Sequence, residues 1–109
     1  AILAMQHIFR VGALPDKSLD ANQTFVLQHL DTVTRVLEEG QAAALAMLLP
    51  VAGPDHDDWR EALALDLARK YAPIRVNVVA ASDQSSADET LAYLRDAPGV
   101  TGQYLKVHE

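Results

Sequence analysis

The chain has 109 residues, of which half are hydrophobic and 22% are charged, a composition typical of a single globular domain. Its 15 acidic residues outnumber the 9 basic ones, and the net charge of −6 argues against a nucleic-acid partner. The absence of cysteine excludes disulfides and thiolate metal sites, and the apolar runs are too short for a membrane span, so the cytoplasm is the default location.

The first segments of the chain predict a strand followed by a loop. Ile2–Met5 is a short apolar run of the kind that forms a buried strand. It begins abruptly and has no basic leader, so it does not resemble a signal peptide. Phe9–Asp16 contains Gly12 and Pro15 and is expected to be a loop.

A long helix is expected next. It should start near Ser18 or Asp20, because Asp20 and Gln23 have the spacing of a capping box. Gly40 is expected to end it, since glycine readily adopts the left-handed cap conformation. The apolar side of this helix is predicted to consist of Val26, Leu30, Val33 and Leu37.

The middle of the chain predicts a buried strand and a second helix. Ala42–Pro50 is apolar without alternation, which favours a strand buried on both faces of a parallel sheet. The acidic residues from Asp55 to Asp58 favour a helix start, and Pro73 is expected to stop that helix. Its apolar side is predicted to consist of Trp59, Leu63, Leu67 and Tyr71.

The last third predicts strand, helix and strand. Ile74–Ala80 is the clearest strand, and Gln103–Val107 is the last one, after a turn at Pro98 and Gly99. Between them, Ser86 and Glu89 have the form of a capping box for a short helix with Leu91 and Leu94 on its apolar side. Strands that alternate with helices predict one α/β domain over residues 1–109, with right-handed crossovers between parallel strands.

Several segments carry a resemblance to a known family. They are the strand Ile74-Arg75-Val76-Asn77, the turn Val100-Thr101-Gly102-Gln103 and, more weakly, Ile8-Phe9-Arg10-Val11-Gly12. Together with the helix that precedes the strand, they resemble the carboxyl half of a short-chain dehydrogenase/reductase. The resemblance implies a truncated Rossmann-like fold, a three-layer parallel sheet of about four strands with helical crossovers. These would be the family's strands four to seven.

The groups that carry the family's chemistry are missing from this sequence. It has no glycine-rich phosphate loop and no Tyr-x-x-x-Lys. Where the family has the motif Asn-Asn-Ala-Gly, this sequence has Ala4-Met5-Gln6-His7. The family's catalytic Asn would lie near His29, and its Ser segment is replaced by Val51-Ala52-Gly53. Hydride transfer needs both the nicotinamide and a proton relay, so we expect no catalytic residue and no cofactor.

Three functions remain open at this point. The preferred one is a non-catalytic short-chain dehydrogenase/reductase-like subunit that assembles with itself or with a complete reductase, in a structural or regulatory role. The second is part of an NAD(P)-dependent oxidoreductase whose cofactor-binding half lies on another chain or outside this sequence. The start at Ala1 rather than Met favours this alternative. The third is a small-molecule binding domain that uses the crevice at the carboxyl ends of the strands.

These functions point to two sets of residues. The expected crevice consists of Gln6, His7, His29, Ala52, Gly53, Ala81 and Ser82. Complete family members pair through two long helices, and the residues that would contribute here, apart from those that face the sheet, are Val26, Leu30, Val33, Trp59, Leu63 and Leu67.

Histidines and tyrosines are interpreted mainly as structural. His56 lies among acidic residues at a helix start, which favours a helix cap over a metal site, and no metal is expected. His29 is interpreted as a partly buried helix residue rather than an acid or base. Tyr71, Tyr93 and Tyr104 are each expected to pack in the core or an interface.

One consequence concerns the first strand, which is central in a complete reductase. In this chain its outer edge would have no neighbour, and an apolar edge strand invites pairing. A second copy, a different subunit or a rearranged strand of the same chain would have to cover it.

Overall fold

The computed structural model describes residues 5–107 and contains one parallel sheet with the strand order β1-β2-β3-β4. The strands are β1 (Gln6–Arg10), β2 (Ala44–Leu49), β3 (Arg75–Ala80) and β4 (Tyr104–Lys106). The predicted α/β Rossmann-like sheet with four parallel strands is confirmed.

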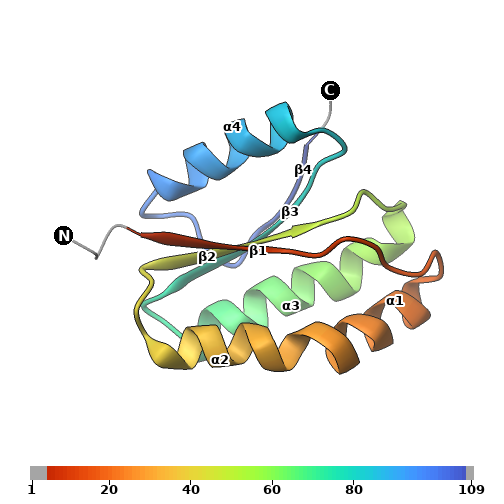
Figure 1. Cartoon of the computed structure of the whole chain (residues 1–109), viewed down its shortest axis with the longest axis horizontal. Helices are drawn as coiled ribbons and strands as arrows, with labels where there is room; N and C mark the ends of the chain where they lie inside the picture. Colours follow the sequence, from red (N-terminus) through yellow and green to blue (C-terminus); the bar gives the residue numbers. More distant parts are fainter. Residues whose placement is uncertain (1–4, 108–109) are drawn as a thin grey trace.

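Helices cover both faces of this sheet, as Figure 1 shows. A continuous helical segment comprises α1 (Ser18–Phe25), a π-helical turn η2 (Val26–Leu30) and α2 (Asp31–Glu39). It lies on one face together with α3 (Asp57–Lys70), which a short 3-10 turn η3 (Pro54–His56) precedes. The opposite face is covered by α4 (Gln84–Arg95). No helix among residues 5–107 is long and apolar enough to cross a membrane.

The third crossover has the opposite hand to the first two. Strand order continues in one direction from β1 to β4, but the connecting helix changes face between β2–β3 and β3–β4. The first two crossovers are right-handed, so β3-α4-β4 is left-handed, the rare arrangement for parallel strands. The expectation of right-handed crossovers throughout was therefore wrong for the last one.

The first strand lies later in the sequence than predicted. Of the predicted strand Ile2–Met5, the residues before Met5 lie outside the described ones, and Met5 itself precedes β1. The predicted loop Phe9–Asp16 begins too early, because Phe9 and Arg10 belong to β1. An edge strand with exposed positions lacks the continuous apolar pattern by which a buried strand is found.

The long helix begins and ends near the predicted positions, but its start is built differently. Lys17 is the N-cap and makes no side-chain capping bond, so the capping box predicted at Asp20 and Gln23 is absent and Asp20 lies within the first turn. At the other end Gly40 has a φ of 69° and provides the predicted left-handed cap.

The π-helical turn keeps one side of this helix on the sheet. The buried residues Ala21, Phe25, Val33 and Leu37 are spaced at multiples of four. In an α-helix each step of four overshoots a full turn by about 40°. The wider turn η2 takes up part of this drift, so Phe25 and Leu37 both reach the core. Val26, which was predicted on the apolar side of the helix, stays exposed.

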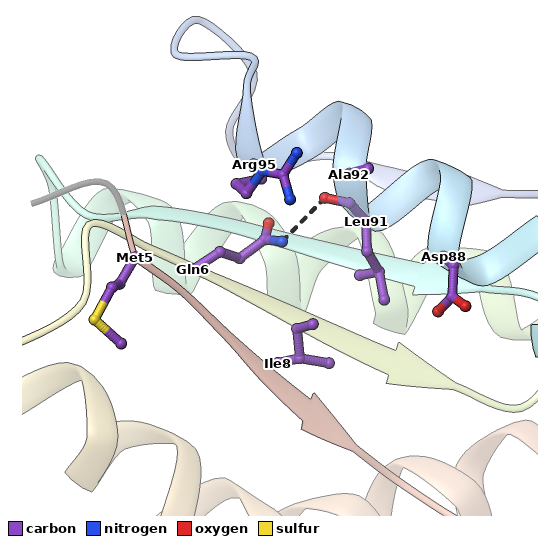
Figure 2. Close-up of a pocket in the computed structure, with 7 residues that line it drawn as sticks. All are labelled: Met5, Gln6, Ile8, Asp88, Leu91, Ala92 and Arg95. Atoms are coloured by element: carbon purple, nitrogen blue, oxygen red, sulfur yellow. Dashed lines mark hydrogen bonds between the residues drawn. The ribbon is translucent and has the colours of Figure 1, made fainter. Parts of the chain in front are cut away.

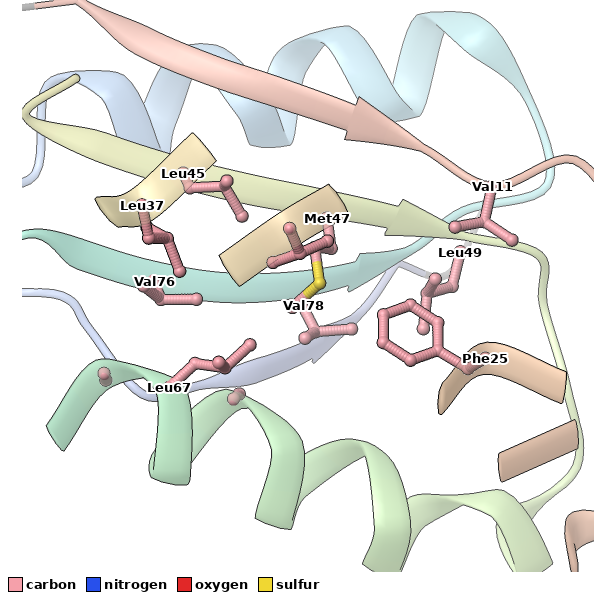
Figure 3. Packing of buried hydrophobic residues seen from close by; sticks show 12 residues of the cluster. Val11, Phe25, Leu37, Leu45, Met47, Leu49, Leu67, Val76 and Val78 are labelled. Atoms are coloured by element: carbon pink, nitrogen blue, oxygen red, sulfur yellow. The ribbon is translucent and has the colours of Figure 1, made fainter. Parts of the chain in front are cut away.

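The main core lies between the sheet and the helices α1 to α3. Figure 3 shows side chains of β2 and β3 packed against both helical segments. In α3 the buried residues beneath the sheet are Arg60, Ala64, Leu67 and Ala68, whose two alanines let the helix approach closely. The apolar side predicted for α3 is rotated around the helix axis from these buried residues, because Trp59, Leu63 and Tyr71 are only half-buried. A smaller core of Ala46, Val79, Leu91 and Leu94 lies under α4.

Asp83, rather than the predicted Ser86, caps α4. Its carboxylate accepts the backbone N–H of Ser86 at 2.8 Å. The predicted apolar positions Leu91 and Leu94 are buried as expected.

The other end of α4 is held by β3, which fixes the left-handed crossover. The Nη1 group of Arg75 donates to the carbonyl oxygens of Leu94 and Ala97, each at 2.8 Å. Asn77 donates to the carbonyl oxygen of Val100 and accepts the N–H of Gln103, which guides the chain into β4. The segment that resembles the family thus has a structural role in this chain.

We expect Arg75→Met to lower the free energy of unfolding by about 2–3 kcal/mol, because it leaves helix-end carbonyls without a charged donor. Urea denaturation measures this change. Arg69→Met, at an exposed position of α3, is the matched control. Equal losses for the two variants would contradict the anchoring role of Arg75.

Candidate functional site

Two hollows lie at the carboxyl ends of β1, β2 and β3. One has a volume of about 280 Å³, and Ala52 and Gly53 are among its lining residues. The other has a volume of about 500 Å³, and Ala81 and Ser82 are among its lining residues. Val51 lines both, so these four predicted crevice residues lie around one continuous edge of the sheet.

The other predicted crevice residues lie elsewhere. Because β1 begins at Gln6, both Gln6 and His7 lie at the amino end of the sheet, away from the crevice. His29 is in the π-helical turn, where its ring contacts those of Phe9 and Phe25 with centroid distances of 5.9 and 5.7 Å. These ring contacts fit the structural interpretation of His29.

A buried arginine lies beside the smaller hollow, and sequence reasoning missed it. Arg60 is 1% exposed, and its Nη1 group donates to the carbonyl oxygen of Pro50 at 2.8 Å and to the Tyr104 hydroxyl at 3.1 Å. Its guanidinium lies over the rings of Trp59 and Tyr104, at 5.3 and 5.7 Å from their centroids. The Nε atom is buried without a hydrogen-bond partner among the described residues. Arg60 therefore ties the end of β2 to β4 beneath the crevice.

His56 is also buried beside this hollow, and its ring does not cap the helix. Its Nε2 lies 2.8 Å from the carbonyl oxygen of Asp16, and its Nδ1 accepts the indole N–H of Trp59 at 3.3 Å. This pairing places the ring proton on Nε2, which donates to Asp16. Within residues 5–107 no group of three or more histidines, cysteines or carboxylates is arranged to hold a metal ion.

Two of the three tyrosines make side-chain hydrogen bonds, and the third is exposed. The Tyr104 hydroxyl is bound by Arg60, and that of Tyr71 donates to Glu38 at 3.0 Å. Tyr93 is 59% exposed on α4, so it does not pack in the core, and the other expectation, that it packs in an interface, stays a prediction. The polar side chains at the crevice thus hold backbone segments and one another together.

An ion pair joins the start of α3 to β4 beside the crevice. The Lys106 ammonium lies 2.8 Å from a carboxylate oxygen of Asp57. The hydrogen bond to Asp57 raises the pKa of Lys106 above its usual 10.5. A lysine pKa that is higher in the folded than in the unfolded chain stabilises the fold. This stabilisation is complete at a pH below the pKa of the unfolded chain and is lost as the pH rises through the pKa of the folded chain.

A second candidate region follows the open side of β1. Figure 2 shows a groove of about 490 Å³ between β1 and α4, lined mainly by Met5, Gln6, Ile8 and Leu91. The Gln6 amide donates to the carbonyl oxygen of Leu91 at 3.0 Å across it. On the other face, β1 and α2 flank a hollow of about 380 Å³ that His7 and Val36 help to line. The edge strand therefore has open space on both sides.

Most of the predicted interface residues face the core. Val33 and Leu67 are buried, and Leu30, Trp59 and Leu63 pack against the same core while half-buried. Of this set only Val26 is strongly exposed.

Substitution of Asp57 by Asn should bring the pKa of Lys106 down toward 10.5, because the charged acceptor is lost. A pH titration of the Lys106 side chain by NMR measures the shift. The nearby exposed Asp58→Asn is the control and should leave it unchanged. An equal change of the Lys106 pKa in both variants would show that the acidic start of the helix as a whole, and not the ion pair with Asp57, raises this pKa.

Comparison with known proteins agrees with this fold. Neither the curated proteins nor the solved structures include a match to the chain. The family model SDR-like, described as short chain dehydrogenase-like protein, matches residues 9–107, from within β1 to the residue after β4. Since this match covers nearly the whole chain, the protein belongs to the SDR-like family of short chain dehydrogenase-like proteins.

Proposed function

We propose that this chain is a non-catalytic short-chain dehydrogenase/reductase-like subunit that acts by assembly, either with itself or with a complete reductase. The observation that carries this proposal is an apolar stripe on the outer side of the first helical segment. It consists of Leu19, Val26 and Leu27, which are 78%, 46% and 76% exposed.

The spacing of these residues supports one contiguous surface. Val26 and Leu27 follow Leu19 by seven and eight residues, so all three project from one side of the helix. Exposed apolar residues that cluster in this way mark interaction surfaces more often than residues that are scattered singly. Of these three, only Val26 was among the predicted interface residues, because those residues were taken from the line of Val26, Leu30, Val33 and Leu37.

The resemblance to the family indicates the kind of partner. Complete members pair through two long helices, and the segment Ser18–Glu39 corresponds to the first of them. A partner that presents a similar apolar helix would fit, which describes both a second copy and a complete reductase. We place this assembly in the cytoplasm as part of the proposal, because a chain without cysteine needs no oxidising compartment to fold.

The polar residues of the crevice support a role without hydride transfer. Arg60, His56 and Tyr104 use their polar atoms on backbone carbonyls and on one another. The sequence holds no Tyr-x-x-x-Lys to relay a proton. We expect titration with NADH or NADPH to show no saturable binding. Micromolar affinity together with turnover of a carbonyl compound would reject the proposal.

Leu27→Glu should weaken assembly at least about tenfold, because it places a charge in an apolar contact. Sedimentation velocity measures self-association, and the same variant is tested for binding to a complete reductase of the family. Gln28→Glu adds the same charge at the neighbouring exposed position and is the matched control. A wild-type chain that stays monomeric and binds no reductase would contradict the proposed role.

A second candidate function is small-molecule binding in the crevice. It is favoured by the two hollows at the carboxyl ends of the strands, the usual place of ligands in open α/β sheets. Val51→Trp should fill the space that both hollows share. A compound that raises the melting temperature of the wild-type chain, but not of this variant, would support a ligand site. Equal shifts in both proteins would place the compound elsewhere.

A further inference from the structure

Arg60 is a buried cation that has no acidic partner among residues 5–107. It is 1% exposed, and the ion pairs of these residues join other side chains. Its charge is met by a carbonyl, a hydroxyl and two aromatic faces. Buried charges in proteins are usually paired, because removing a charge from water costs free energy that neutral partners only partly return. An anion is therefore the partner that Arg60 lacks within the described residues.

One edge of the Arg60 guanidinium is unused. Both of its hydrogen bonds to other described residues come from Nη1, which binds Pro50 and Tyr104. The Nε atom is buried without a partner among these residues. In a guanidinium, Nε and Nη2 form the edge that binds two oxygens of one carboxylate or phosphate group. The side chain without a counter-ion thus keeps a two-donor edge in reserve.

The hollow of about 280 Å³ at the carboxyl end of β2 lies beside this side chain, since Arg60 is one of its lining residues. Its volume is below the range typical of sites for drug-sized ligands, so it suits a molecule of a few carbon atoms. Val51, Ala52 and Gly53 also line it, and their backbone N–H groups bind no backbone carbonyl of the described residues. The loop therefore adds neutral donors beside the buried cation.

The rest of the lining favours a monovalent ligand with an apolar end. The His56 ring is neutral in this arrangement, because its Nδ1 accepts the N–H of Trp59. The exposed side chains of Asp16 and Asp55 also border the hollow, and they disfavour a ligand with more than one negative charge. The apolar residues of the lining are Leu14, Pro15, Pro50, Val51 and Ala52.

We propose that this hollow binds a short-chain monocarboxylate. The carboxylate accepts hydrogen bonds from Nε and Nη2 of Arg60, and the hydrocarbon end lies against the apolar lining. This inference rests on the second candidate function, small-molecule binding in the crevice, and names the ligand class for it. It does not involve the stripe of Leu19, Val26 and Leu27, so it is independent of the proposed assembly.

Trp59 provides a signal for binding. Because Nε of Arg60 is out of reach of water, the carboxylate binds it only when the Arg60 side chain shifts toward the hollow. Trp59 is the single tryptophan of the chain, and its ring centroid lies 5.3 Å from the guanidinium carbon of Arg60. Its indole N–H also donates to His56 at 3.3 Å. The fluorescence of Trp59 should therefore change when the carboxylate binds.

Titration of the full chain with butyrate, butyramide and inorganic phosphate at constant ionic strength tests the ligand class. Butyramide keeps the hydrocarbon end without the charge, and phosphate keeps the charge without the hydrocarbon end. Butyrate should give a saturable change of Trp59 fluorescence, with an affinity at least about tenfold higher than that of either other compound. No saturable change with butyrate, or an equal affinity for one of the other compounds, would overturn the inference.

Arg60→Met tests the two-donor edge. It should weaken butyrate binding at least about tenfold, because the charged donors are lost. Arg69→Met, at an exposed position of the same helix, is the matched control and should bind butyrate like the wild type. Circular dichroism checks that both variants are folded. Unchanged butyrate affinity in folded Arg60→Met would contradict the role of Arg60.

Ala52→Leu tests the site without a change to Arg60. It fills part of the hollow of about 280 Å³, whereas Ala81→Leu makes the same change in the neighbouring hollow of about 500 Å³. The first variant should weaken butyrate binding at least about tenfold, and the second should leave the affinity within about twofold of the wild type. Equal affinities in the two variants would place the carboxylate elsewhere and overturn the inference.

The same variants separate this inference from the candidate function on which it rests. If butyrate does not bind, but a compound of another class binds and Ala52→Leu or Val51→Trp weakens it, the crevice remains a ligand site and the monocarboxylate is rejected. Failure of every compound to bind would reject both. Leu27→Glu should bind butyrate like the wild type, because Leu27 does not line the hollow.

Discussion

Each strand of a parallel sheet offers hydrogen-bonding groups to both sides, and among residues 5–107 β1 has a neighbour on one side only. Its second row of backbone groups is satisfied by water or by chain outside these residues. The apolar Ile8 and Met5 beside this row make water a poor solution. The exposed Leu19, Val26 and Leu27 form a second unpartnered surface on the first helical segment, and this is the surface that the proposed assembly uses.

The rest of the fold keeps the family scaffold with polar contacts that serve structure. Arg75 and Asn77 hold the left-handed crossover by binding the end of α4 and the chain that leads into β4. Arg60 joins β2 to β4 beneath the crevice where a reductase would carry out its chemistry. In this chain the polar side chains Arg60, Arg75 and Asn77 therefore hold the backbone in place.

The sequence predicted best the elements whose burial leaves a simple pattern. Ala44–Leu49 and Arg75–Ala80 are central strands buried on both faces, so their apolar runs were sufficient to find them. Gln6–Arg10 was misplaced because an edge strand keeps polar residues.

The candidate site was less predictable. Arg60 was overlooked because charged residues are usually exposed, and only the three-dimensional contacts with Pro50 and Tyr104 explain its burial. The exposed stripe that includes Leu27 was missed because Leu27 does not share the helical spacing of Val26, Leu30, Val33 and Leu37, from which the interface was predicted. Asp83 was missed as the cap of α4 because Ser86 and Glu89 offered a competing capping pattern.

Amide hydrogen exchange of the first helical segment, measured at several protein concentrations, tests the proposed assembly most directly. The amides of β2 and β3, the two central strands of the sheet, serve as an internal reference that is protected in either case. If Leu19, Val26 and Leu27 form an interface, exchange in Ser18–Glu39 should slow as the protein concentration rises or when a complete reductase is added. Exchange in this segment that does not change with protein concentration or with an added reductase would contradict the account.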